Sequence, residues 1–326
     1  MTLSKDKFVS LLTAAILLWT IGNTDCPAQT NVIFDTDIGS DCDDAGAMAV
    51  LHKLADKGEI NILGVIFSSE KNKFGVGTCD AINTYYGRGN LPLGHAKGNE
   101  VGDSRNLYSQ VIAEAKDEYG HRLVDSAAAL LDVYKNILAG QPDSSVTIVS
   151  VGHPYGLYTL LRDAEGKELI GRKVSRWVVM THTDTAPLQD WNFGKNGAAP
   201  YVKYLLGNWP GKIFFSGAGK TILTGHKKLP FSPDPNPVKK AYEIWRFNAL
   251  VRGRSSWDQI AVLFAARPGY FHVDARGSLV QNEQYETYWD VASDRANHYR
   301  ITPALDDREM ENMIEDLMSE QPSAKR

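Results

Sequence analysis

Five aspartates lie within ten residues near the start of the chain, in the segment Asp35-Thr36-Asp37-Ile38-Gly39-Ser40-Asp41-Cys42-Asp43-Asp44. Two like charges about 4 Å apart repel by roughly 4 kcal/mol at an effective dielectric constant near 20. A folded chain tolerates such a cluster if the carboxylates point into water, bind protons or share a cation. The cluster therefore predicts either a solvated acidic loop or a cation-binding site.

The residues on both sides of the aspartates predict a strand, a turn and a helix. Val32-Ile33-Phe34 is a short β-branched and aromatic run, and residues 45–51 are small apolar helix formers. Ligands in open α/β sheets bind at the carboxyl ends of strands, which is where this turn would lie. Capping of the helix N-terminus would account for Asp43 or Asp44. It does not account for all five carboxylates, so we favour the cation site.

The composition argues against a nucleic-acid-binding protein. The chain has 326 residues, of which 43% are hydrophobic and 23% charged, and its formal net charge is −4. This is an ordinary globular composition. Lysine and arginine are scattered, without the basic patch of nucleic-acid-binding proteins, so we expect no nucleic-acid partner. The expected partner is a small-molecule substrate.

The first residues resemble a secretory signal peptide. Two lysines precede the apolar run 8–19, and the small residue Ala28 follows a polar stretch. The run is too short for a comfortable membrane span, and a buried N-terminal helix is the alternative. We expect removal of residues 1–28, leaving residues 29–326 as one catalytic domain without a membrane span. Its expected location is periplasmic or extracellular.

Two cysteines, Cys42 and Cys79, remain in the mature chain. An oxidising compartment would permit a disulfide between them, whereas buried free thiols fit the sequence equally well. No zinc-like spacing of ligands exists, which turns attention to oxygen ligands and a hard cation such as calcium.

Strand and helix patterns alternate along the chain and predict an α/β fold with an open, mostly parallel sheet and helices on both faces. The expected strands are residues 32–34, 60–67, 146–151, 176–180 and 212–216, and the expected helices are 74–86, 124–139 and 238–251. The proline-rich residues 230–237 predict a surface loop. Met310, Met313, Ile314 and Leu317 are spaced to dock a C-terminal helix on the core.

Four segments resemble, in order, the motifs of the inosine-uridine-preferring nucleoside hydrolases. Asp35 to Ala45 is similar to the family fingerprint Asp-Thr-Asp-x-Gly-x-Asp-Asp-Ala, with two extra residues before the final Asp-Asp. Val146 to Leu157, Asp190 to Phe193 and Trp257 to Ala261 are similar to three later family segments. The resemblance spans about residues 31 to 270, and it implies a Rossmann-like core and hydrolysis of the N-glycosidic bond of ribonucleosides.

The resemblance also implies roles for particular residues. Its implied Ca²⁺ ligands are the side chains of Asp37, Asp44 and Asp258 and the backbone carbonyl of Val151. Asp37 would also act as general base toward a water held by the metal. The implied ribose-binding residues are Asp43, Asp184, Asp190 and Asn192. Such a carboxylate-rich pocket suits the oxocarbenium-like ribosyl cation through which N-glycosidic cleavage passes.

The chain departs from the family where the leaving base is protonated. Many members carry a histidine before the late aspartate, but this chain has Trp257, whose indole donates a hydrogen bond and no useful proton. His153 and His182 follow predicted strands and are candidate substitutes, although such histidines are often structural. Trp257 is instead a candidate to stack on a base or sugar. Glu70 stands near the position of a ribose-binding asparagine.

Two other functions remain open. A haloacid-dehalogenase-type phosphohydrolase also has two carboxylates after an apolar strand, but Gly39 stands where that family needs threonine or valine. A secreted, non-catalytic ribose or nucleoside binder would keep the metal site and lose turnover through Trp257. The resemblance further implies a homo-oligomer, because nucleoside hydrolases are often dimers or tetramers.

Overall fold

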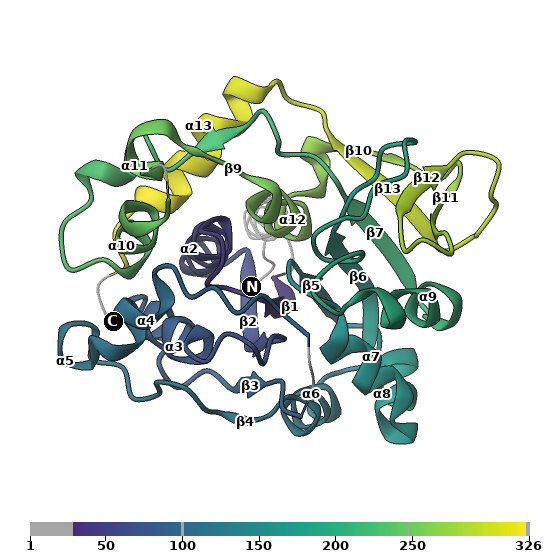
Figure 1. The fold of residues 1–326 in the computed structure, drawn as a ribbon, viewed down its shortest axis with the longest axis horizontal. Helices are drawn as coiled ribbons and strands as arrows, with labels where there is room; N and C mark the ends of the chain where they lie inside the picture. The colour runs from purple at the N-terminus through teal and green to yellow at the C-terminus, as the bar shows by residue number, and fades with distance from the viewer. Residues whose placement is uncertain (1–28, 99–100, 247, 324–326) are drawn as a thin grey trace, which may run out of the picture.

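The computed structural model describes residues 29–98, 101–246 and 248–323 (Figure 1). The expected signal peptide, residues 1–28, lies outside them. Across these ranges, no helix has both the length and the apolar composition that a membrane crossing requires.

A nine-stranded sheet forms the centre of the molecule, in the order β10-β13-β7-β6-β5-β1-β2-β3-β4. All neighbours are parallel except β10 and β13 at one edge. This confirms the predicted α/β class. The strands are β1 (Thr30–Thr36), β2 (Ile60–Phe67), β3 (Leu93–His95), β4 (Ala128–Ala129), β5 (Val146–Ser150), β6 (Val174–Met180), β7 (Lys212–Ser216), β10 (Phe271–Asp274) and β13 (His298–Pro303).

The order of the strands reverses between β1 and β5. From β1 the chain continues to β2 on one side, and from β5 it continues to β6 on the other. Open α/β sheets bind ligands at such a switch point, outside the carboxyl ends of the strands. The aspartate cluster follows β1, and Val151 follows β5, so both lie at this position.

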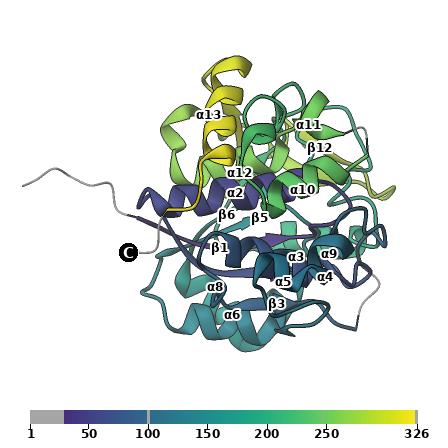
Figure 2. The same cartoon turned by 90° about the vertical axis from the view of Figure 1, so that its left-hand side faces the viewer.

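Helices cover both faces of the sheet (Figure 2). Alternate residues of β1 point to opposite faces: Val32 and Phe34 belong to one apolar core and Ile33 to the other. Packed against the first core are α2 (Asp43–Asp56), α3 (Gly75–Tyr85), α4 (Ser109–Glu114), α5 (Lys116–Tyr119), α10 (Pro237–Ile244), α11 (Ala249–Arg252), α12 (Trp257–Ala266) and α13 (Asp307–Ser319). Packed against the second are α6 (Leu130–Ala139), α7 (Tyr155–Arg162), α8 (Ala164–Lys173) and α9 (Ala199–Asn208).

Two predicted helices have different boundaries in the structure. The helix expected from residue 124 begins at Leu130, because Ala128 and Ala129 pair with β3 and the Val124 carbonyl accepts a hydrogen bond from Gly77. The helix expected over 238–251 is broken between α10 and α11. In both places tertiary contacts override local helix propensity.

Several short strands late in the chain were not predicted. They form β10 and β13 of the large sheet and two small antiparallel pairs, β11 (Ser278–Gln281) with β12 (Thr287–Asp290) and β8 (Leu223–Thr224) with β9 (Arg254–Ser255). The C-terminal helix is confirmed, with Met310, Ile314 and Leu317 buried. Cys42 and Cys79 are buried free thiols.

Candidate functional site

A cavity of about 630 Å³ lies at the carboxyl ends of the parallel strands. Most of its lining comes from the loops after β1, β5, β6 and β7 and from the start of α12, and the rest comes from Arg105, Trp245, Arg246 and Arg254. The volume is in the range of small-molecule sites. Of the residues with an expected role, those on its lining are Asp37, Asp43, Asp44, Val151, His182, Asp184, Asp190, Asn192, Trp257 and Asp258.

Three carboxylates meet at the base of this cavity. One oxygen from each of Asp43, Asp44 and Asp258 lies within 4.8 Å of the others, and all three residues are at most 4% exposed. The first two begin α2 and the third begins α12, and these helices pack against each other. Burial, followed by repulsion from neighbouring aspartates, raises the pKa of each carboxyl well above its ordinary value.

The donor set fits a hard divalent cation. Asp44 accepts a hydrogen bond from the Thr36 hydroxyl, but neither Asp44 nor Asp258 forms an ion pair with any described lysine or arginine. Buried carboxylates without such a partner are costly unless a cation neutralises them. Oxygen-only ligands favour calcium or magnesium over zinc.

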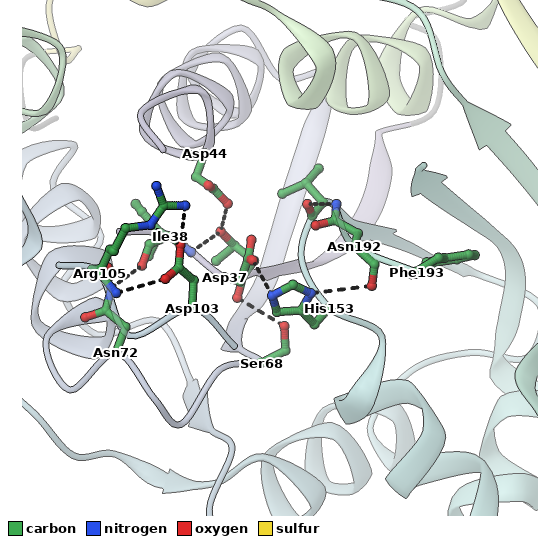
Figure 3. Close-up of polar contacts among 12 residues, drawn as sticks. Asp37, Ile38, Asp44, Ser68, Asn72, Asp103, Arg105, His153, Asn192 and Phe193 are labelled. Atoms are coloured by element: carbon green, nitrogen blue, oxygen red, sulfur yellow. Dashed lines mark hydrogen bonds and ion pairs between the residues drawn. The ribbon is translucent and has the colours of Figure 1, made fainter. Parts of the chain in front are cut away.

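Asp37 lines the cavity beside these three carboxylates, and His153 supports it from behind. The Nε2 atom of His153 lies 3.0 Å from Oδ2 of Asp37, and its Nδ1 lies 3.4 Å from the backbone oxygen of Asn192 (Figure 3). His153 is fully buried. Burial is the largest single influence and would lower the pKa of His153, but the charge of Asp37, the contacts with Asp37 and the Asn192 backbone, and the charge of Asp190 together raise it. This placement favours a role in orienting Asp37 over contact with a leaving base.

Close packing of the backbones brings the ends of β1 and β5 together. A Cβ atom on Gly152 would lie 2.4 Å from the Asp37 nitrogen and 2.7 Å from the Thr36 carbonyl carbon. Only glycine allows that approach. The adjacent Val151 carbonyl, an expected metal ligand, accepts a 2.7 Å hydrogen bond from Nδ2 of Asn192. A carbonyl oxygen has a second lone pair that can still bind a cation.

Asp190 is held in place by two donors. Its Oδ2 accepts hydrogen bonds from the Thr181 hydroxyl at 2.8 Å and from the Phe193 backbone nitrogen at 2.9 Å. Burial raises its pKa although both hydrogen bonds favour the carboxylate. Its other oxygen is therefore the one left to accept a hydroxyl proton from a ligand.

His182 is the histidine that reaches the cavity. Its Nε2 lies 2.8 Å from the Ala186 carbonyl, which can only accept, so Nε2 carries the hydrogen. Its Nδ1 lies 4.0 Å from a carboxylate oxygen of Asp184, an exposed residue of the same loop. Nδ1 is thus the nitrogen available to bind and release a proton.

Arg254 is a site residue that the sequence did not reveal. Its guanidinium binds Asp41, lies 3.4 Å from Asp43, and stacks 4.5 Å over Trp257 and 4.9 Å over Trp245. Two features of the sequence pointed toward it. Asp41 is a carboxylate to which the resemblance assigns no role, and Arg254 stands four residues before the expected metal ligand Asp258. Arg105 and Trp191 also line the cavity, although neither of them had an expected role from the sequence. Glu70, in contrast, is outside the lining and accepts a hydrogen bond from the Gly98 nitrogen.

No family model and no curated protein matches this sequence. The structure resembles that of the inosine-uridine preferring nucleoside hydrolase from Bacillus anthracis, with a TM-score of 0.69 and 15% sequence identity over 89% of this chain and 99% of that chain. It resembles an inosine-guanosine nucleoside hydrolase (TM-score 0.66, 16% identity, 90% and 100% covered). A third similar structure is the type III effector protein XopQ complexed with adenosine diphosphate ribose (TM-score 0.63, 12% identity, 97% and 99% covered). The chain therefore has the nucleoside hydrolase fold.

Proposed function

We propose that this protein is a calcium-dependent N-glycosyl hydrolase that cleaves ribonucleosides or related ribosides to free base and ribose. The observation that carries the proposal is the convergence of Asp43, Asp44 and Asp258 at the base of a cavity on the switch point of the sheet. The fold it shares with nucleoside hydrolases supports the same chemistry. The complex of the effector protein extends the candidate ligands to other ribose derivatives.

Asp44 and Asp258 would hold the cation, together with Asp37 and the Val151 carbonyl. When bound, calcium would supply a Lewis acid that binds ribose hydroxyls and lowers the pKa of water. Asp43 and Asp190 would accept hydrogen bonds from the ribose hydroxyls. Their carboxylates would also stabilise the positive charge that develops on the sugar.

Asp37 would accept the proton of the attacking water. Because His153 contacts Oδ2, the Asp37 carboxylate would be held in one orientation toward the water whose proton it accepts. His182 would protonate the leaving base from Nδ1, which lies on the side of the ring that faces Asp184. Trp257 would pack against the base or the sugar.

One observation favours a non-catalytic binder as the second candidate. Arg254 lies against Asp43, so part of the carboxylate cluster already has a cationic partner. A binder would retain the metal and the ribose contacts without turnover. Export after loss of residues 1–28 and assembly into a homo-oligomer also belong to the proposal.

The test is a screen of purified residues 29–326 with calcium against purine and pyrimidine nucleosides, with release of base and ribose as the readout. Release that stops with EDTA and returns with calcium supports the hydrolase. Ribose or nucleoside binding by calorimetry without product supports the binder. Hydrolysis of p-nitrophenyl phosphate without ribose release would instead identify a phosphohydrolase.

A further inference from the structure

Four cationic side chains line the cavity away from its carboxylate base. This cationic rim consists of Arg105, Lys195, Lys220 and Arg246. Both lysines and Arg246 are exposed, whereas the three clustered carboxylates are buried. The cavity is therefore negative at its base and predominantly positive around its opening, where Asp184 is the exposed carboxylate.

Two members of the rim are available to a ligand. Lys195 and Lys220 form no ion pair with any carboxylate in the part of the chain that the structure describes. Arg105 is paired with Asp103 at 2.5 Å. A cation without a protein partner costs little at an exposed position, and it gains most from an anionic group brought by the ligand.

Aromatic side chains line the same cavity as these cations, among them Trp191 and Trp257. Arg105 lies over Trp191 at 5.2 Å, with Lys195 four residues further along the chain. The Lys220 carbonyl accepts a hydrogen bond from Ser255, two residues before Trp257. The lining of this cavity thus combines aromatic rings with cationic side chains, which suits a molecule that carries both a base and a phosphate.

We infer that the substrate is a phosphorylated riboside rather than a neutral nucleoside. The inference rests on the proposed function and names its substrate class. The ribose would bind at the carboxylate base with the cation, and the phosphate would bind Lys195 and Lys220. In the reaction the bond from the anomeric carbon to the base nitrogen breaks, water oxygen bonds to that carbon, and one water proton goes to the base. The phosphate ester is unchanged.

The test measures base release from inosine, inosine 5′-monophosphate and adenosine diphosphate ribose by the mature chain with calcium. The latter two separate a mononucleotide from a diphosphate-linked riboside. We expect kcat/KM for a phosphorylated substrate to exceed that for inosine at least tenfold. Lys195→Ala and Lys220→Ala should each lower this ratio about fivefold to tenfold, and Lys220→Arg should retain it. Lys203→Ala removes the same charge from α9, outside the cavity, and should leave the ratio unchanged.

Turnover of inosine equal to or faster than that of both phosphorylated substrates overturns the inference and leaves the proposed function standing. Absence of base release from all three compounds and from every nucleoside of the screen overturns the proposed function, and calorimetry then tests only the remaining part of the inference, that the cationic rim binds a phosphorylated riboside as ligand. Binding of inosine 5′-monophosphate that Lys220→Ala weakens at least fivefold supports it. Absence of binding by both phosphorylated compounds overturns it.

Discussion

Arg254 forms a two-point ion pair with Asp41: Nε lies 2.7 Å from Oδ1, and Nη2 contacts Oδ2. Such paired contacts match the planar guanidinium to the carboxylate. Asp41 stands in the two-residue insertion that separates this chain from the family fingerprint. The insertion therefore supplies the carboxylate that holds Arg254 against Trp257 on the cavity wall.

Arg254→Lys should raise KM about tenfold with a smaller change in kcat, because lysine keeps the charge but loses the paired contact and the stacking. Steady-state kinetics on the best substrate of the screen measures this. Arg252→Lys is the control, since Arg252 is exposed two residues away and does not line the cavity. An unchanged KM in the Arg254 variant would show that the pair does not shape the site.

Calcium should raise the melting temperature of the protein comprising residues 29–326 by several degrees. A ligand present at one hundred times its Kd stabilises the native state by about 2.7 kcal/mol. Asp44→Asn and Asp258→Asn should each abolish the shift, and both should unfold at a higher temperature than the unsubstituted protein when calcium is absent, because one buried repelling charge is gone. Asp132→Asn, on the exposed surface of α6, should keep the full shift. A full calcium shift in the Asp258 variant would contradict the ligand set.

Asp37→Asn should lower kcat by about 10²- to 10⁴-fold, the usual contribution of a general base. The amide has the same shape but accepts no proton from water. His153→Gln should lower kcat less, about tenfold, because it loosens Asp37 without removing the base. Single-turnover rates measure both. Full activity in the Asp37 variant would falsify its role.

His182→Gln should lower kcat about 10²-fold for a purine nucleoside, whose base leaves as a protonated group. For p-nitrophenyl β-D-ribofuranoside the loss should be much smaller, because p-nitrophenolate leaves without a proton. The comparison therefore separates proton donation from a structural effect. Equal losses on both substrates would mean that another residue protonates the base.

His52 should make the protein less stable as the pH falls. Its ring is buried against Tyr86 and contacts Asn83 at 2.9 Å, and burial, followed by the charge of Arg88, lowers its pKa to about 3. Between pH 6.5 and pH 3 the unfolded chain binds a proton that the folded chain does not. Above pH 6.5 His52 is neutral in both states and does not change the free energy of unfolding. At pH 5 protonation of the unfolded chain lowers that free energy by on the order of 2 kcal/mol.

Urea denaturation at pH 7.5 and pH 5 measures this loss, with His52→Gln as the comparison, because glutamine can contact Asn83 and does not titrate. Between pH 7.5 and pH 5, the unfolding free energy of the unsubstituted protein should decrease relative to that of the variant by on the order of 2 kcal/mol. The two proteins would show the same pH dependence if His52 were protonated in the native state. Burial raises the pKa of Asp35 to about 7, so Asp35 makes the folded state more stable as the pH falls. Because both proteins contain Asp35, its effect cancels in the comparison.

Between β1 and β7, the sequence predicted the five longest strands (β1, β2, β5, β6 and β7) and the helices α2, α3 and α6, but not the short strands β3 and β4 or the helices α4, α5, α7, α8 and α9. Fully buried parallel strands are continuous apolar runs, and the β-branched run at 146–151 agrees with the fully buried β5, while the apolar runs at 60–67 and 212–216 agree with β2 and β7. The strands from β8 to β13 were missed because each has only two to six residues, and because all except the β11–β12 hairpin pair with a partner remote in sequence.

The sequence by itself determined that a carboxylate-rich turn follows an apolar strand and begins a helix, because strand periodicity, glycine and helix formers act over a few neighbouring residues. Only the tertiary structure decided which distant residues join it. Packing of α12 on α2 brings Asp258 beside Asp44, and the loop before α12 brings Arg254 to Asp41. The two candidate histidines also differ in position: His153 is fully buried behind Asp37, whereas His182 lines the cavity. These outcomes depend on long-range packing and on the cost of burying charge, which no local pattern encodes.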